Sequence, residues 1–246
     1  MSTIRTLDRA FLILRIVARH PQGIGVSAIA AELGLAKSTI SRLLSAMDSW
    51  ELVERTAENR FRIGSEPVRW VGRQPFTTTL PALVRPILQN IAEETGEAAA
   101  ICVLEGFQVS YLDHVQSYQD IQVRDWTGEQ IPPHVSSAGK VLLAFSGPDF
   151  GEAFLKRPLQ PFTDRSIVDP EELRKELLAV RERGYAMTDE EYGEGIIGLA
   201  VPVFNGHGDA VAAINVYGPK FRLDSPAKQA QIIKKMKAAV ETLINV

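Results

Sequence analysis

Residues 34–44 of this 246-residue sequence, GLAKSTISRLL, carry side chains that could contact an anion or a nucleic acid. Their polar residues are two cations and three hydroxyls: Lys37, Ser38, Thr39, Ser41 and Arg42. Short hydroxyls and cations at the start of a helix suit the phosphate oxygens and base edges of a DNA major groove. The same composition is common on a solvated helix face, so the neighbouring elements must decide between the two interpretations.

The segments around this stretch predict two further helices. Apolar residues recur at helical spacing at Leu7, Phe11, Leu14 and Val17 or Ala18, which indicates a first amphipathic helix. Ser27 is the expected N-cap of a second, short helix that ends at Gly34. The stretch that begins at Gly34 then forms a third helix, with its apolar side packed on the first two.

Two short strands follow the third helix. WELVER at 50–55 and FRIG at 61–64 flank a polar turn and predict a β-hairpin. The order of helix, short helix, glycine turn, helix and hairpin predicts a winged helix-turn-helix domain over residues 1–65. The hairpin adds three cations to the candidate DNA-binding surface: Arg55, Arg60 and Arg62.

Composition and charge support a two-part globular chain. Hydrophobic residues make up 45% of the sequence, which is enough for packed cores and unlike a disordered protein. Residues 1–75 hold 11 Lys and Arg against 7 Asp and Glu, a net charge of +4. The other residues hold 16 against 23, a net charge of −7. A basic N-terminal part joined to an acidic remainder is typical of a nucleic-acid-binding module fused to another domain.

The middle of the chain reads as a linker. Four prolines and a threonine run lie within residues 65–86, and they predict a linker over residues 66–80. Pro67, Gly72 and Pro75 are expected to interrupt any helix there.

Residues 81–246 predict an antiparallel sheet with helices, so the whole chain is placed in the α+β class. The clearest helix has Asp169 as its N-cap, Pro170 at its first position and Gly184 just past its end. Other helices are expected at 83–94, 136–145 and 224–246. Strands are expected at 98–104, 108–115, 121–126, 185–188, 196–204 and 210–218.

Residues that could support catalysis or bind a metal are scattered. The four histidines lie far apart, and none is at metal-ligand spacing with Cys102, the single cysteine. There is no G-x-S-x-G nucleophile elbow, and SSAGKV lacks the first glycine of a phosphate-binding loop. Glu190, Glu191 and Glu194 could supply a carboxylate pair, although a polar loop is the commoner use of such residues. We therefore expect no enzyme activity, no metal and no cofactor.

The sequence also indicates a compartment. A single cysteine permits no internal disulfide, which fits a reducing environment. Arg15 and Arg19 interrupt the apolar N-terminal run, which lacks a signal-peptide cleavage site and the roughly 20 apolar residues of a membrane helix. We expect a cytoplasmic protein with no membrane partner.

Two features of the C-terminal part suggest a binding pocket. Ser136 and Ser137 lead into a helix whose first N–H groups favour an anion such as a carboxylate, although a simple N-cap is the alternative. Asn215 and Tyr217 alternate in an apolar strand and therefore point to one face of the sheet. They either line a pocket there or are hydrogen-bonded inside the core.

These segments resemble the IclR-type bacterial transcriptional regulators. The N-terminal resemblance is carried by LDRAFLIL, VSAIAAELGLAKSTISRLLSAMDSWELVER and FRIG. The C-terminal resemblance is carried by GEAAAICV, IPPHVSSAGKVLLAF, RGYAMTDEEYGEGIIGLAVPV and AVAAINVYGPKFRL. It implies a GAF-like, PAS-like effector-binding domain, a homodimer or dimer of dimers, operator DNA as a partner, and control of catabolic genes by a small metabolite, often a carboxylic acid.

By position, the resemblance implies these effector-binding residues: Ser137, Ala138, Thr188, Ile196, Gly198, Asn215 and Tyr217. Thr188 stands where some members of the family carry an acid, and Tyr217 is bulkier than the hydroxyl residues common there. We expect a medium-sized acid, aromatic acids included, with Tyr111 and Trp126 as pocket walls.

We therefore expect an effector-responsive DNA-binding regulator, with repression as the expected direction of control. Two other functions fit parts of the sequence. One is a metabolite-processing enzyme with a fused helical module, and the other is a winged helix that binds proteins rather than DNA.

Overall fold

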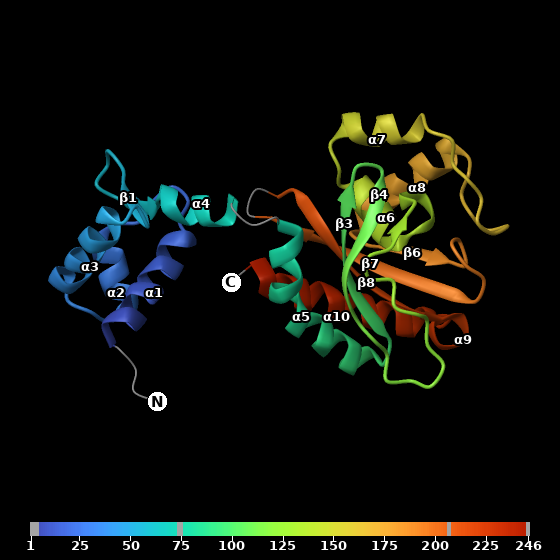
Figure 1. Cartoon of the computed structure of the whole chain (residues 1–246), viewed down its shortest axis with the longest axis horizontal. Helices are drawn as coiled ribbons and strands as arrows, with labels where there is room; N and C mark the ends of the chain where they lie inside the picture. The colour runs from blue at the N-terminus through green and yellow to red at the C-terminus, as the bar shows by residue number, and fades with distance from the viewer. Residues whose placement is uncertain (1–4, 73–75, 206–207, 245–246) are drawn as a thin grey trace. The chain divides into compact units, whose positions relative to one another are not determined.

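The structure, a computed structural model, describes residues 5–72, 76–205 and 208–244 (Figure 1). The chain divides into two compact units, residues 1–76 and residues 77–246, which we call the N-terminal and C-terminal units. None of the described helices is both long enough and apolar enough to cross a membrane.

The N-terminal unit is a small helical domain with a two-stranded hairpin. Its elements are α1 (Arg5–Ala18), α2 (Val26–Leu33), α3 (Lys37–Ser49), β1 (Val53–Arg55), β2 (Phe61–Ile63) and α4 (Ser65–Gly72). Helices α1, α2 and α3 and the hairpin share one core, which includes Ile13, Ile29, Ile40, Leu44 and Phe61. The predicted helix-turn-helix with its wing is therefore present.

Two details of the N-terminal prediction are wrong. Leu7 and Phe11, expected on the buried side, are 50% and 57% exposed, while Leu14 packs on the core and Val17 is buried as expected, together with Ile13 and Ile16. Helix α1 is apolar on more than one side, so spacing alone left two possible faces, and packing on α3 and β2 selected the second.

Ser27 is not the N-cap of α2. The cap residue is Gly25, which makes no side-chain capping bond. Ile24 and Phe61 exchange two backbone hydrogen bonds of 2.9 Å each, and this bridge to β2 fixes the chain so that the helix begins directly afterwards.

The C-terminal unit contains a six-stranded antiparallel sheet with strand order β5-β4-β3-β8-β7-β6. The strands are β3 (Ala98–Glu105), β4 (Gln108–Val115), β5 (Gln130–Ile131), β6 (Ala186–Asp189), β7 (Ile196–Phe204) and β8 (Ala210–Pro219). The expected strand at 121–126 is absent from this described segment. Asp125 instead accepts hydrogen bonds from Thr127 N and Oγ1, which makes a turn, and Trp126 turns inward and is buried.

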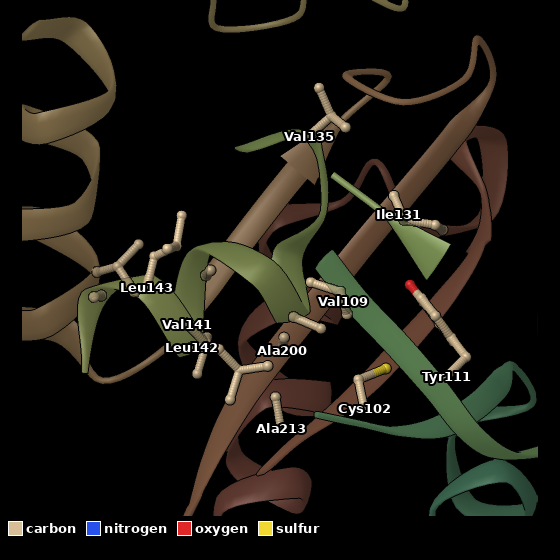
Figure 2. Close-up of a cluster of buried hydrophobic side chains, with 14 of the residues drawn as sticks. Cys102, Val109, Tyr111, Ile131, Val135, Val141, Leu142, Leu143, Ala200 and Ala213 are labelled. Atoms are coloured by element: carbon tan, nitrogen blue, oxygen red, sulfur yellow. The ribbon is translucent and has the colours of Figure 1, made fainter. Parts of the chain in front are cut away.

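Helices cover both faces of the sheet (Figure 1). One face carries α6 (Ser137–Ala144), α7 (Pro148–Leu155) and α8 (Pro170–Arg183), with the short 3₁₀ helix η1 (Pro133–Val135) leading into α6. The other face carries α5 (Phe76–Thr95), α9 (Lys220–Leu223) and α10 (Pro226–Ile244). Figure 2 shows the first core, where α6 side chains such as Val141 and Leu142 meet Val109 of β4 and Ala213 of β8.

The predicted linker, residues 66–80, contains most of α4 and the first residues of α5, and residues 73–75 lie outside the described part. Helix α5 begins at Phe76 rather than at Leu83 and contains Pro81 and Pro86. Leu80, Val84 and Leu88 are buried against the sheet at helical spacing, and this packing outweighs the local cost of the prolines. Asn205 and Gly206 are of the residue types that form a tight turn between two strands, and Gly206 lies outside the described residues.

Candidate functional site

Helix α3 of the N-terminal unit presents a polar face to solvent. Lys37, Ser38, Ser41 and Arg42 are exposed, and Thr39 is half-buried. Among the described residues, neither Lys37 nor Arg42 has an ion-pair partner. Both cations are therefore available to a partner outside the chain.

The first turn of α3 adds backbone donors. Its N-cap, Ala36, makes no side-chain capping bond, and the first backbone bonds run from Thr39 N and Ile40 N to Ala36 O. The N–H groups of Lys37 and Ser38 have no hydrogen-bond acceptor in the described part of the chain. A helix start of this kind, beside a lysine, favours a phosphate oxygen.

The three arginines of the hairpin differ in availability. Arg62 lies opposite Glu54 in the β1–β2 ladder and forms an ion pair with it. The Arg55 guanidinium stands 5.9 Å from the centroid of the Phe61 ring. Arg60 is exposed and has no ion pair within the described residues. Within the described residues, Arg55 and Arg60 of the wing therefore carry no ion pair, while Glu54 partly neutralises Arg62.

The C-terminal unit brings most of the predicted effector residues around one cavity, which we call the α6 cavity. Its lining residues are Tyr111, Trp126, Ile131, Val135, Ser136, Ser137, Thr188, Tyr192, Ile196, Gly198, Asn215 and Tyr217. Ala138 is buried in α6 and does not line the cavity. The cavity volume is about 30 Å³, room for about two water molecules.

A chain of hydrogen bonds links the start of α6 to the sheet. Ser137 Oγ donates to Asn215 Oδ1 at 2.9 Å, and Asn215 Nδ2 donates to Tyr111 OH at 3.0 Å. Ser136, not Ser137, is the N-cap, since its Oγ accepts from Gly139 N at 3.3 Å. The N–H groups of Ser137 and Ala138 have no acceptor among the described residues, so the helix start can still receive an anion.

Gly198 makes room for the two hydroxyls at this end of the cavity. It pairs with Thr188 on β6 and with Tyr217 on β8. A Cβ atom at Gly198 would lie 2.8 Å from Ser137 Oγ and 2.9 Å from Thr188 Oγ1. The absence of a side chain is therefore what allows both hydroxyls to approach the same strand.

Aromatic rings fill much of the space around the cavity. Sequence reasoning identified Tyr111, Trp126 and Tyr217 but missed Tyr192, which comes from the loop between β6 and β7. Only its position inside the quoted segment RGYAMTDEEYGEGIIGLAVPV could have indicated it. Burial raises the pKa of both Tyr111 and Tyr217, so their hydroxyls remain protonated.

Two of the three candidate catalytic carboxylates, Glu190 and Glu191, are paired with lysines. Glu191 Oε1 accepts from the buried Lys140 Nζ at 2.6 Å, and Glu190 Oε2 accepts from Lys220 Nζ at 2.7 Å. In the described residues, no three His, Cys, Asp or Glu side chains gather as metal ligands. The loop at 190–195 is therefore tied by ion pairs rather than arranged as an acid–base pair.

Comparison with protein families gives two matches that together span almost the whole chain. The model for the IclR helix-turn-helix domain matches residues 6–57. The model for the bacterial transcriptional regulator IclR C-terminal domain matches residues 77–244.

Individual proteins agree with these matches. The HTH-type transcriptional regulator BhcR of Paracoccus denitrificans is 32% identical over 240 residues, which cover 97% of this chain and 86% of BhcR. The Agobacterium tumefaciens repressor BlcR, whose crystal structure is known, is 26% identical in sequence. The match covers 99% of this chain and 97% of the BlcR chain, and the two structures superpose with a TM-score of 0.71. An IclR homolog from Microbacterium hydrocarbonoxydans, complexed with 4-hydroxybenzoate, is 24% identical, with coverages of 96% and 98% and a TM-score of 0.62.

Proposed function

This chain belongs to the IclR family of bacterial transcriptional regulators, and from that membership we propose that it is a cytoplasmic repressor of catabolic genes. It is a DNA-binding regulator, as its family and relatives are, rather than a metabolite-processing enzyme. The finer proposal covers three points: the residues that touch DNA, the class of effector, and the direction of control.

The DNA-binding part of the proposal is carried by the start of α3. Two cations, Lys37 and Arg42, and the N–H groups of Lys37 and Ser38 lie in the first two turns of this helix and have no partner within the described part of the chain. In a dimer, or a dimer of dimers, two such helices would enter successive major grooves about 34–36 Å apart. Ser38, Thr39 and Ser41 would position the helix or read base edges, while Arg55 and Arg60 of the wing would add phosphate contacts.

The effector part of the proposal places a small organic acid in the α6 cavity. The free N–H groups of Ser137 and Ala138 would receive its carboxylate, and Asn215 and Thr188 would complete the polar end. The homolog from M. hydrocarbonoxydans was solved with an aromatic acid, which supports an acid of this kind as the class. Repression is supported by the A. tumefaciens relative, which is a repressor.

Binding of the acid would change the affinity for DNA by shifting the population between two arrangements of the dimer. The shift is limited by the ratio of the acid's affinities for the two arrangements. An acid that binds both equally would leave DNA binding unchanged.

The test is a mobility-shift titration on the DNA upstream of this protein's own gene, at physiological salt with excess nonspecific competitor. We expect a specific shift that one member of a panel of aliphatic and aromatic carboxylates abolishes. A shift that an acid strengthens would contradict simple repression with an inducing acid. If no specific shift is seen, the protein is used to select bound fragments from the whole genome. A selection that yields no DNA fragment would contradict operator binding and favour a protein partner for the winged helix.

Arg42→Ala should weaken DNA binding and leave acid binding unchanged. Loss of one phosphate contact lowers the salt slope of the binding constant by about 1, so a dimer would lose about 2. Binding is measured by fluorescence anisotropy of labelled operator DNA between 50 and 200 mM salt. Arg181→Ala, which removes an exposed arginine from α8, is the matched control and should keep the full slope. An equal decrease of the salt slope in Arg42→Ala and Arg181→Ala would count against α3 as the contact surface.

Gly198→Ala should weaken acid binding at least tenfold, because its Cβ atom would press on the Ser137 and Thr188 hydroxyls. The affinity for DNA without the acid should stay within about twofold, since the N-terminal unit is untouched. Gly147→Ala is the control: it has an ordinary φ of −57° and open space for the added methyl. Titration calorimetry with the acid from the mobility-shift panel measures the acid affinity of each variant. An unchanged acid affinity in Gly198→Ala would refute this geometry.

A further inference from the structure

Four aromatic rings line the α6 cavity, and we call them the aromatic cage: Tyr111, Trp126, Tyr192 and Tyr217. Trp126 lies at their centre, with its ring centroid 4.9 Å from that of Tyr192, 5.8 Å from Tyr111 and 5.9 Å from Tyr217. The Tyr111 and Tyr217 rings meet edge to face at 6.3 Å. Rings from four separate segments therefore converge on a single small space.

The polar groups of the cavity are unevenly distributed. No lysine or arginine is among its lining residues, so nothing but the start of α6 and neutral side chains would face an anion. Trp126 Nε1 and Tyr217 OH are buried and have no hydrogen-bond partner among the residues that the structure describes. The cavity thus combines the start of α6, which favours an anion, with uncharged aromatic walls.

Aromatic faces attract cations because the ring quadrupole places negative potential above each face, and the attraction grows when water is excluded. Trp126 already shows this preference on its outer face, where the Arg124 guanidinium stands 5.4 Å from the ring centroid. Glu129 neutralises that arginine, and Asp125 adds a carboxylate beside the cage, 3.2 Å from His114 Nδ1. The charges around the cage therefore do not oppose a cation inside it.

We propose that the effector is a small zwitterion, with a carboxylate at the start of α6 and a quaternary ammonium group inside the aromatic cage. This rests on the proposed function, because it takes the α6 cavity to be the effector site. A primary ammonium group would need about three acceptors for its N–H bonds, whereas the aromatic cage offers tyrosine hydroxyls and no carboxylate is among the described residues that line the cavity. A fully methylated ammonium group has no N–H bonds and makes no such demand.

The cage must open to admit this group, since the free volume is only about 30 Å³. Tyr111 and Tyr217 stand on strands β4 and β8 and form a fixed wall. Trp126 stands on the irregular segment between β4 and β5, which can rearrange at lower cost, whereas the loop that carries Tyr192 is held by the Lys140–Glu191 ion pair. The ligand would part the Trp126 ring from the wall and take its place against it.

The test compares pairs of carboxylates that differ only in the charge of the bulky group, which is a trimethylammonium group in one member and a tert-butyl group in the other. Titration calorimetry on the full chain measures the affinity for each member, with one, two or three carbons between this group and the carboxyl group. N,N,N-trimethylglycine and 3,3-dimethylbutanoate are the first such pair, and 4-hydroxybenzoate is added as an aromatic acid. We expect at least one trimethylammonio acid to bind tenfold or more tightly than its isostere.

Variants locate the selectivity. Trp126→Leu should reduce the ratio of the affinity for the trimethylammonio acid to the affinity for its tert-butyl isostere to about one. Tyr217→Phe, which keeps its ring, should preserve most of this ratio. Thermal melting checks that both variants fold, and Trp126→Phe serves as the milder change if Trp126→Leu does not.

Equal or tighter binding of the isostere, or binding of 4-hydroxybenzoate alone, would overturn the zwitterion and leave the acid-responsive regulator standing. Binding of none of these acids, together with DNA binding that no acid in the wider panel changes, would overturn the proposed effector class as well.

Discussion

Replacing Arg222 by methionine is expected to lower the free energy of unfolding of the C-terminal unit by about 3–5 kcal/mol. Glu97 is 1% exposed, and its two carboxylate oxygens accept from Arg222 Nε and Nη2 at 2.8 Å each. Removal of the guanidinium leaves the buried carboxylate with Lys228 Nζ, 3.5 Å away, as its remaining cation. The loss follows because a buried charge without its partner keeps its desolvation penalty.

Urea denaturation followed by circular dichroism measures this effect, and a double-mutant cycle isolates it. Glu97→Gln removes the charge while keeping the size of the side chain, so Arg222→Met should cost much less in that background. Equal cost in both backgrounds would show that Arg222 acts through its other contacts, such as its bond to Ile121 O at 2.8 Å.

Lys140→Met is expected to have a comparable effect, again about 3–5 kcal/mol. Lys140 is 1% exposed in a helix that is buried along its whole length, and Glu191 is its ion-pair partner at 2.6 Å. Burial raises the pKa of Glu191, and the positive charge of Lys140 acts against that rise. A carboxyl group with a raised folded-state pKa contributes stability that is present at low pH and lost as the pH rises through that pKa. The loss in Lys140→Met should therefore be larger at pH 8 than at pH 5.

The double variant Lys140→Met/Glu191→Leu is the control, because it removes both charges and leaves an apolar contact. It should recover most of the stability and lose the extra pH dependence, since replacing both partners of a buried pair is often neutral. Stability of the double variant no better than that of Lys140→Met would contradict this account. Because Glu191 precedes Tyr192, the same pair also holds the loop that closes the α6 cavity.

Local patterns in the sequence determined several elements of this protein. Asp169 and Gly184 bound helix α8 as predicted, with Asp169 Oδ1 accepting from Glu172 N and Gly184 adopting a φ of 72°. The helix-turn-helix, the hairpin and the antiparallel sheet were also predicted. Capping, turn formation and helical spacing depend on residues that are close in sequence, so these features can be read without the fold.

The tertiary structure decided the rest. Which side of α1 is buried, the turn in place of a strand at 121–126, and the pairing of Arg62 with Glu54 depend on contacts with other elements.

The α6 cavity depends on such contacts as well. It joins Ser137 to Asn215, 78 residues later, and Asn215 to Tyr111, 104 residues earlier. The sequence alone determined the family and the polar residues that could bind DNA and an acid. Only the packed sheet decided that Trp126 and Tyr192 meet at one cage, because the register between distant strands is set by the burial of whole faces and not by any local pattern.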